Sequence, residues 1–121
     1  MKSLFAKMAM ATSLGLSMIS VQLPAHADTK VGLILPYTGT YAALGNAITD
    51  GFNMAIEEAG RTDEFSIVTE DTEAKPPVGL AKARKLVLQD KVDVMVGVVS
   101  SGVLGAMRDF IHQSQVPLIV A

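Results

Sequence analysis

The sequence predicts an α/β fold in which helices cover both faces of a doubly wound parallel sheet. Short apolar runs of strand length alternate with segments whose apolar residues recur at helical spacing. Pro, Gly and Ser residues, which favour turns, separate the two kinds of segment. Because parallel strands need a long crossover between them, this alternation of strand and helix indicates a parallel sheet.

The first part of the predicted sheet contains two strands joined by a helix. Residues 30–35 are an apolar run closed by Pro36, as expected for a buried strand. From Leu44 onward apolar residues recur on one helical face, and Gly60 follows as the expected C-terminal cap. Residues 65–69 form the second predicted strand, and the polar residues after them predict a loop.

The second part adds a helix, a strand, another helix and a final strand. A helix is predicted over residues 77–89, with a proline in its first turn, and a strand over residues 92–99. After a short turn, the apolar stripe over residues 103–114 predicts a third helix. Residues 116–121 begin a fourth apolar strand with no helix to cover it. We therefore expect this chain to be the front part of a longer protein.

Residues 1–27 have the organisation of a secretory signal peptide. Two lysines at the start precede an uncharged stretch over residues 8–21, and residues 25–27 have the small-x-small pattern of a cleavage site. The stretch is shorter than the roughly 20 apolar residues that a spanning helix needs. We therefore expect a periplasmic mature protein over residues 28–121, without a membrane anchor. The alternative is a buried N-terminal helix.

Composition excludes several classes of function. Ten basic against twelve acidic residues give a net charge of −2, so nucleic-acid binding has no electrostatic support. The chain has no Cys, which excludes disulfides, thiolate metal sites and a Cys nucleophile. His112 is the one His outside the predicted signal peptide, and no GxGxxG pattern follows the first strand. We therefore expect neither a metal nor a cofactor.

The predicted topology places a ligand site before any motif is considered. In a doubly wound sheet the second and third strands lie on opposite sides of the first. The loops that leave strands one and three therefore diverge and open a crevice at the carboxyl edge of the sheet. These loops cover residues 36–45 and 99–102, and both are rich in small and hydroxyl-bearing residues. We expect a small ligand to bind between them.

Ser100, Ser101 and Gly102 form a candidate anion site directly before the third predicted helix. Amide groups at a helix start lack intrahelical partners, and the helix dipole favours a negative charge there. The two hydroxyls add donors, and Gly102 allows a ligand to approach the backbone closely. The turn contains no Lys or Arg, so a carboxylate fits it better than a phosphate. The alternative is that one of the serines only caps the helix.

Three parts of the sequence resemble type 1 periplasmic substrate-binding proteins of the leucine/isoleucine/valine-binding branch. They are residues 31–60, the pair Glu70-Asp71 and residues 93–121. The likeness covers essentially all of residues 28–121 in the expected order. It implies a fold of two α/β lobes, joined by a hinge, that close on a small ligand. Residues 28–121 would then form part of the first, amino-terminal lobe.

The resemblance also implies roles for individual residues. Ser101 and the amide of Gly102 match the groups that hold the ligand carboxylate, and Ser100 lies where some members have a disulfide Cys. Leu44 lies where relatives place a side chain, often an aromatic one, against the ligand. The implied function is that of an exported solute-binding protein of an ABC-type importer. It would capture a small carboxylate, such as a branched-chain amino acid or an aromatic acid, for a permease in the inner membrane.

Two other functions remain open. One is a ligand-sensing ectodomain of the same fold, and the other is an exported α/β serine hydrolase that uses Ser100 or Ser101. A serine nucleophile needs an adjacent base. His112 lies about 10 residues further along the same predicted helix, or roughly 15 Å of rise, so a base would have to come from elsewhere. We therefore expect a binding protein rather than an enzyme.

Overall fold

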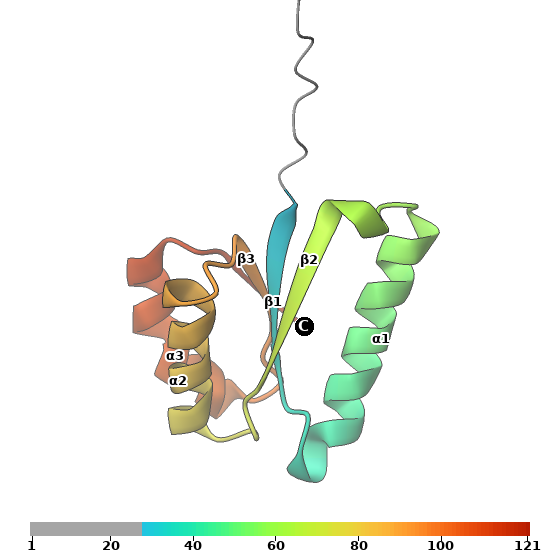
Figure 1. Cartoon of the computed structure of the whole chain (residues 1–121). Helices are drawn as coiled ribbons and strands as arrows, with labels where there is room; N and C mark the ends of the chain where they lie inside the picture. Colours follow the sequence, from blue (N-terminus) through green and yellow to red (C-terminus); the bar gives the residue numbers. More distant parts are fainter. Residues whose placement is uncertain (1–27) are drawn as a thin grey trace, which may run out of the picture.

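The computed structural model describes residues 28–121, and the predicted signal peptide over residues 1–27 lies outside them. Strands and helices alternate along the described chain (Figure 1). In chain order the elements are β1 (Thr29–Leu35), α1 (Ala42–Glu58), β2 (Phe65–Asp71), α2 (Pro76–Leu88), β3 (Val94–Gly97), α3 (Ser101–Ser114) and β4 (Leu118–Val120). Two short 3-10 helices, η1 (Gly39–Tyr41) and η2 (Thr62–Glu64), precede α1 and β2.

The strands form one parallel sheet in the order β2-β1-β3-β4. The central strand β1 pairs with β2 along its whole length and with β3 over residues 31–34. Helix α1 lies on one face of the sheet, whereas α2 and α3 lie on the other (Figure 1). The predicted doubly wound parallel sheet is therefore confirmed, with the second and third strands on opposite sides of the first.

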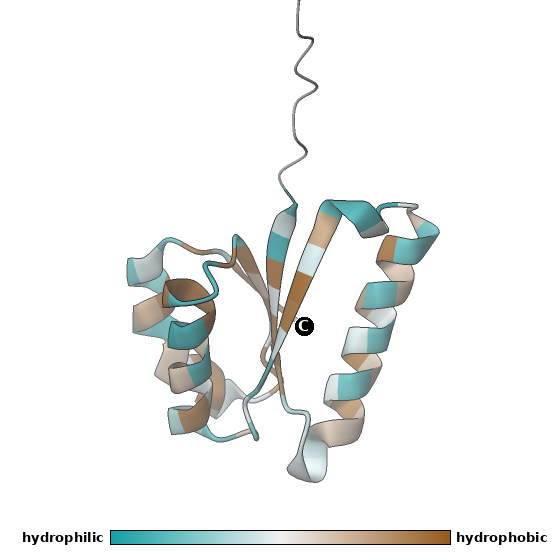
Figure 2. Cartoon of the chain, viewed as in Figure 1, coloured by the Kyte–Doolittle hydropathy of each residue, from teal (hydrophilic) through white to brown (hydrophobic). Residues whose placement is uncertain are grey.

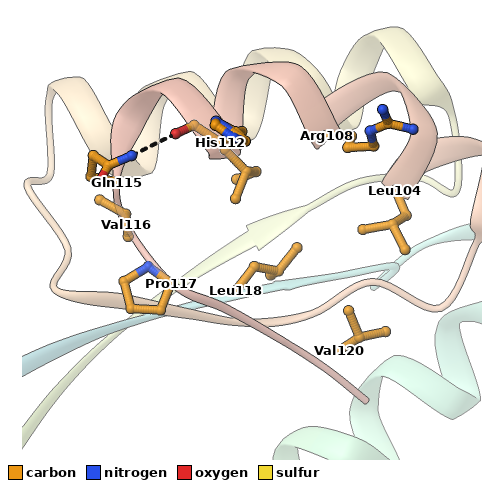
Figure 3. A pocket seen from close by; sticks show the side chains of 9 residues that line it. Leu104, Arg108, His112, Gln115, Val116, Pro117, Leu118 and Val120 are labelled. Atoms are coloured by element: carbon orange, nitrogen blue, oxygen red, sulfur yellow. Dashed lines mark hydrogen bonds between the residues drawn. The ribbon is translucent and has the colours of Figure 1, made fainter.

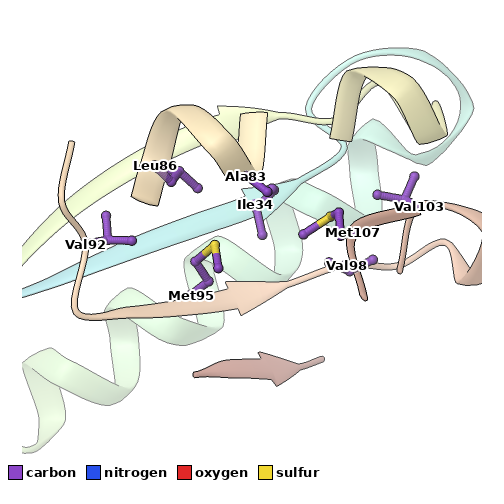
Figure 4. Packing of buried hydrophobic residues seen from close by; sticks show 8 residues of the cluster. All are labelled: Ile34, Ala83, Leu86, Val92, Met95, Val98, Val103 and Met107. Carbon is purple, nitrogen blue, oxygen red and sulfur yellow. The ribbon is translucent and has the colours of Figure 1, made fainter. Parts of the chain in front are cut away.

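Apolar side chains between the sheet and helices α2 and α3 form the main core cluster (Figure 4). Its buried members are Ile34, Ala83, Leu86, Val92, Met95, Val98, Val103 and Met107. Alternate residues of β1 point to the opposite face, where Val31, Leu33 and Leu35 are also buried. Figure 2 shows hydrophobic residues along the strands, whereas hydrophobic and hydrophilic residues alternate along the helices. The sheet thus has a buried apolar layer on each side of β1.

Element boundaries differ from the prediction where polar residues belong to a strand. β2 continues through Glu70 and Asp71, which the sequence assigned to a loop, because both residues pair with the end of β1. β3 is shorter than the predicted strand over residues 92–99, and Val98 (φ 70°) leaves the extended conformation directly after its last residue, Gly97. Gly60 has the left-handed conformation (φ 65°) expected of a C-terminal cap.

Gly79 allows α2 to pack closely against α3. A Cβ atom at this position would lie 2.3 Å from Cγ1 of Val103. We expect Gly79→Ala to lower the free energy of unfolding by about 1–2 kcal/mol, because the overlap outweighs the better helix propensity of alanine. The matched control is Gly105→Ala on α3, where a Cβ atom meets nothing within 4 Å. It should raise the free energy of unfolding by roughly 0.5–1 kcal/mol in the same urea titration, and equal values for the two variants would contradict the close packing.

Candidate functional site

The carboxyl ends of β1 and β3 lie side by side in the sheet. Ile34 pairs with Gly97, and the N–H of Val98 donates to the carbonyl of Ile34 at 2.9 Å. From these ends the chain runs to α1 on one face of the sheet and to α3 on the other (Figure 1). The two loops therefore diverge at a topological switch point, which is where open α/β sheets bind ligands.

Helix α3 begins at Ser101, with Ser100 in the N-cap position. The carbonyl of Ser100 accepts the N–H of Leu104 at 3.0 Å, but its hydroxyl makes no capping hydrogen bond. Ser100 is thus the N-cap residue, as the alternative predicted, but its hydroxyl does not cap the helix. Ser101 and Gly102 are exposed, and amide groups in the first turn of a helix have no intrahelical partner. The turn thus presents hydroxyl and amide donors to a ligand.

The start of α2 lies beside the start of α3. A Cβ atom on Gly102 would lie 3.6 Å from Cγ of Pro76, the first residue of α2. Both helices therefore direct the positive ends of their dipoles to the same corner of the molecule. Pro76 and Pro77 have no N–H, so the first two residues of α2 contribute field but no hydrogen-bond donor. Lys75, which precedes them, is paired with Glu73 at 2.7 Å.

Leu44 lies in the first turn of α1, on the other side of the sheet edge from α3. Its side chain is 46% exposed. The next residue, Gly45, fixes the position of this turn, because its backbone lies against the carbonyl of Pro36. The structure therefore brings Ser100, Ser101 and Gly102 together in one turn and places Leu44 on a separate helix at the same edge.

Asp71, at the end of β2, is a carboxylate that the sequence did not assign to the site. Its Oδ1 accepts the N–H groups of Tyr37 and Glu73, both at 2.8 Å, and its Oδ2 accepts the Thr38 hydroxyl at 2.7 Å. Burial raises the pKa of Asp71, but the hydroxyl and the amide donors outweigh it and hold the pKa below the ordinary value. The sequence feature that could have identified Asp71 is a carboxylate at the end of a strand next to β1, beside a loop rich in hydrogen-bond donors.

Glu70 precedes Asp71 but makes its contacts with α2. It is only 8% exposed, and its carboxylate pairs with Nζ of Lys82 at 2.8 Å and with Nζ of Lys85. Lys85 also pairs with Asp90 at 2.8 Å. Burial raises the pKa of Glu70, but hydrogen bonds from the two lysines outweigh it and hold the pKa below the ordinary value. This cluster fastens α2 to β2 and supplies no group to the candidate site.

A groove of about 480 Å³ lies between α3 and β4 (Figure 3). Its lining is mainly apolar and includes Leu104, Ile111 and Leu118, but none of the three residues of the α3 turn. His112 also borders this groove, in the last turn of the helix that begins at Ser101. No histidine of residues 28–121 therefore lies beside Ser101 as a base for hydrolysis.

Within residues 28–121 no three His, Asp or Glu side chains gather as metal ligands. The helices in this part of the chain are all too short or too polar to cross a membrane. The hydroxyl and amide donors of the α3 turn can bind an anion by hydrogen bonding and by attraction to the helix dipole.

A family model described as periplasmic binding protein matches residues 28–121. The chain belongs to this family. The match includes the whole described sheet, the α3 turn and Leu44. Family membership confirms the fold class, an α/β sheet that forms part of one lobe.

Relatives within the family confirm the resemblance to the Leu/Ile/Val-binding branch. Leu/Ile/Val-binding protein BraC3 of Rhizobium johnstonii is 31% identical over 100 residues, which cover 78% of this chain and 27% of that protein. The chain therefore spans about a quarter of the length of such a relative.

Two solved structures are also similar. An ABC-transporter solute-binding protein from R. palustris, in complex with benzoate, is 41% identical with a TM-score of 0.73, over 77% of this chain and 27% of that one. The substrate-binding protein LivJ from Streptococcus pneumoniae, in complex with isoleucine, is 28% identical with a TM-score of 0.70, over 77% of this chain and 28% of that one.

Proposed function

We propose that this chain is part of the amino-terminal lobe of an exported solute-binding protein that delivers a small carboxylate to an ABC permease. The observation that carries the proposal is the α3 turn, where free hydroxyl and amide donors meet the positive ends of two helices at the switch point. Benzoate and isoleucine, the ligands of two similar proteins, have a carboxylate in common and little else. An anion-binding helix start suits both.

The mechanism is non-covalent capture. The ligand carboxylate accepts hydrogen bonds from the Ser101 hydroxyl and the Gly102 amide, with Ser100 beside them. Leu44, on the opposite side of the sheet edge, forms an apolar wall against the rest of the ligand. A second lobe would close over the ligand, because binding to the closed form is tighter than binding to the open one. The signal peptide predicted over residues 1–27 supports a periplasmic receptor, whose ligand an inner-membrane permease would accept.

A panel of acids tests the substrate class. The protein expressed from its full reading frame is titrated with benzoate, isoleucine, leucine and, as a neutral control, benzamide. A ligand at about 100 times its Kd raises the free energy of unfolding by about 2.7 kcal/mol, which a thermal shift detects. Binding of at least one acid, without binding of benzamide, is the expected result. Equal affinity for benzoate and benzamide would contradict carboxylate recognition.

Ser101→Ala tests the role of the α3 turn. Loss of a hydrogen bond to a charged group should weaken binding of the best acid by roughly 1–3 kcal/mol, or about 5- to 150-fold in Kd. Ser114→Ala, at the other end of the same helix, is the matched control, because its hydroxyl bonds to the carbonyl of Ile111 and not to the site. Isothermal titration calorimetry measures both Kd values. An unchanged Kd for Ser101→Ala would remove this hydroxyl from the mechanism.

A further inference from the structure

We infer that Asp71 is a positioning residue for ligand binding, which holds the loop between β1 and α1 in place without touching the ligand. The inference rests on the proposed function, because this loop leads into the first turn of α1, which carries Leu44 as the apolar wall of the candidate site. Asp71 lies on β2, whereas the loop and Leu44 follow β1. The side chain therefore joins two segments that are more than 30 residues apart in sequence, as the Tyr37 contact at a separation of 34 residues illustrates.

The loop depends on Asp71 because it has no cap of its own. Thr38 occupies the N-cap position of η1 and Tyr41 that of α1, yet neither makes a side-chain capping hydrogen bond. Of these two N-cap residues, Thr38 is the one whose side chain suits capping, but its hydroxyl donates to Asp71 instead. Thr38, Gly39 and Thr40 are exposed, so little packing restrains this turn. The hydrogen bonds to the Asp71 carboxylate therefore restrain this loop in place of a helix cap and of side-chain packing.

A second set of contacts carries the restraint from the loop into α1. The Thr49 hydroxyl donates to the carbonyl of Gly45 at 2.9 Å, so the Tyr37 hydroxyl is the donor in its 2.8 Å bond to Thr49. Tyr37 thus joins Asp71, through its amide, to α1, through its ring hydroxyl. Leu44 lies between the two anchored points, beside Gly45. Its position relative to the α3 turn is therefore set by Asp71.

The two carboxylate oxygens of Asp71 accept hydrogen bonds from different groups, and this difference suggests which variants to test. Oδ1 accepts the two backbone amides and Oδ2 accepts the Thr38 hydroxyl. Asp71→Asn keeps an oxygen for the amides and offers Thr38 an NH₂ group, to which a hydroxyl can turn as acceptor. Asp71→Ala loses all three bonds. The conservative variant should therefore keep most of the function that the alanine variant loses.

Asp93 provides a matched control. Asp93, in the loop before β3, also joins two distant segments, because its Oδ2 accepts the backbone N–H of Lys30 at 2.7 Å. This contact lies at the amino end of β1, away from the candidate site. A merely structural role predicts the same effect on ligand binding for Asp71→Ala and Asp93→Ala. A positioning role predicts an effect for Asp71→Ala alone.

The experiment measures Kd for benzoate and isoleucine by calorimetry, together with hydrogen exchange at the amides of Tyr37 and Glu73, on the protein from its full reading frame. We expect Asp71→Ala to weaken binding at least tenfold and to speed exchange at both amides, Asp71→Asn to stay within about threefold of wild type, and Asp93→Ala to leave Kd unchanged. Wild-type affinity in Asp71→Ala, or an equal loss in Asp93→Ala, overturns the inference.

The proposed function and this inference can fail separately. If the wild-type protein binds no acid of the panel, the proposed function is wrong and hydrogen exchange alone decides the positioning role. Faster exchange at Tyr37 in Asp71→Ala, reversed in Asp71→Asn, then supports it, and unchanged exchange overturns it. If Asp71→Ala does not fold, the Asp71→Asn and Asp93→Ala variants are compared instead. A tenfold loss of ligand affinity in Asp71→Asn would then contradict the roles proposed for the two carboxylate oxygens.

Discussion

Replacing Gly45 by alanine is expected to lower the free energy of unfolding by about 3 kcal/mol or more, at the upper end of what overpacking costs. A Cβ atom at this position would lie 1.9 Å from the carbonyl oxygen of Pro36 and 2.9 Å from its carbonyl carbon. These are backbone atoms directly after β1, where the carbonyl of Leu35 accepts the N–H of Thr72 at 3.0 Å. The overlap cannot be relieved by rotating a side chain, so α1 would have to move away from the sheet.

Gly51→Ala is the matched control, since both glycines lie in α1. A Cβ atom on Gly51 meets nothing within 4 Å, so alanine there should stabilise the protein by roughly 0.5–1 kcal/mol through helix propensity. Urea unfolding followed by circular dichroism measures both variants. A Gly45→Ala protein as stable as the Gly51→Ala protein would mean that α1 does not approach Pro36 so closely.

The same pair of glycines illustrates what the sequence could and could not predict. Hydrophobic periodicity predicted α1, and the glycine signal predicted the left-handed Gly60 that follows its end, because both depend on local sequence. Nothing local distinguishes Gly45 from Gly51, since the difference between them is the backbone of another element. The order of the strands was predictable because handedness and helical crossovers leave few alternatives for a parallel sheet.

Charged residues inside a strand were the main source of error. Glu70 and Asp71 indicated a loop because carboxylates are rarely buried. In the strand, the lysines of α2 pair with Glu70 and the donors of the loop after β1 bond to Asp71, which offsets the cost of burying the two charges. The candidate site shows the same limit. Topology predicted the edge at which Ser101 lies, but the contribution of Asp71 depends on contacts between segments that the sequence separates widely.

The ion pairs of Glu70 lead to the second large effect. Replacing both Lys82 and Lys85 by methionine should leave a nearly buried carboxylate without a cation. We expect this to lower the free energy of unfolding by about 1–3 kcal/mol at pH 7, because the lysines are themselves 38% exposed and the pairs are partly screened by solvent. The matched control is the triple variant that also carries Glu70→Gln. It removes the unpaired charge and should recover most of the loss, although the Lys85–Asp90 pair remains broken. Equal stability of the double and triple variants would contradict an important role for the buried charge.

The dependence on pH gives the sign of the effect independently. In the wild-type protein the lysines hold the pKa of Glu70 below its ordinary value of 4.5, despite burial. The pairing therefore stabilises the fold above about pH 4.5, and this stabilisation is lost as the pH falls through the lower folded-state pKa. Without the lysines, burial alone acts and raises the pKa of Glu70 above its ordinary value. Protonation of Glu70 then removes the unpaired charge in the double variant. The difference in the free energy of unfolding between wild type and the double variant should therefore shrink as the pH is lowered from 7 to 4. Urea titrations over this range test the reversal, because a deficit that stayed constant with pH would show that the lysines stabilise α2 by packing rather than by charge.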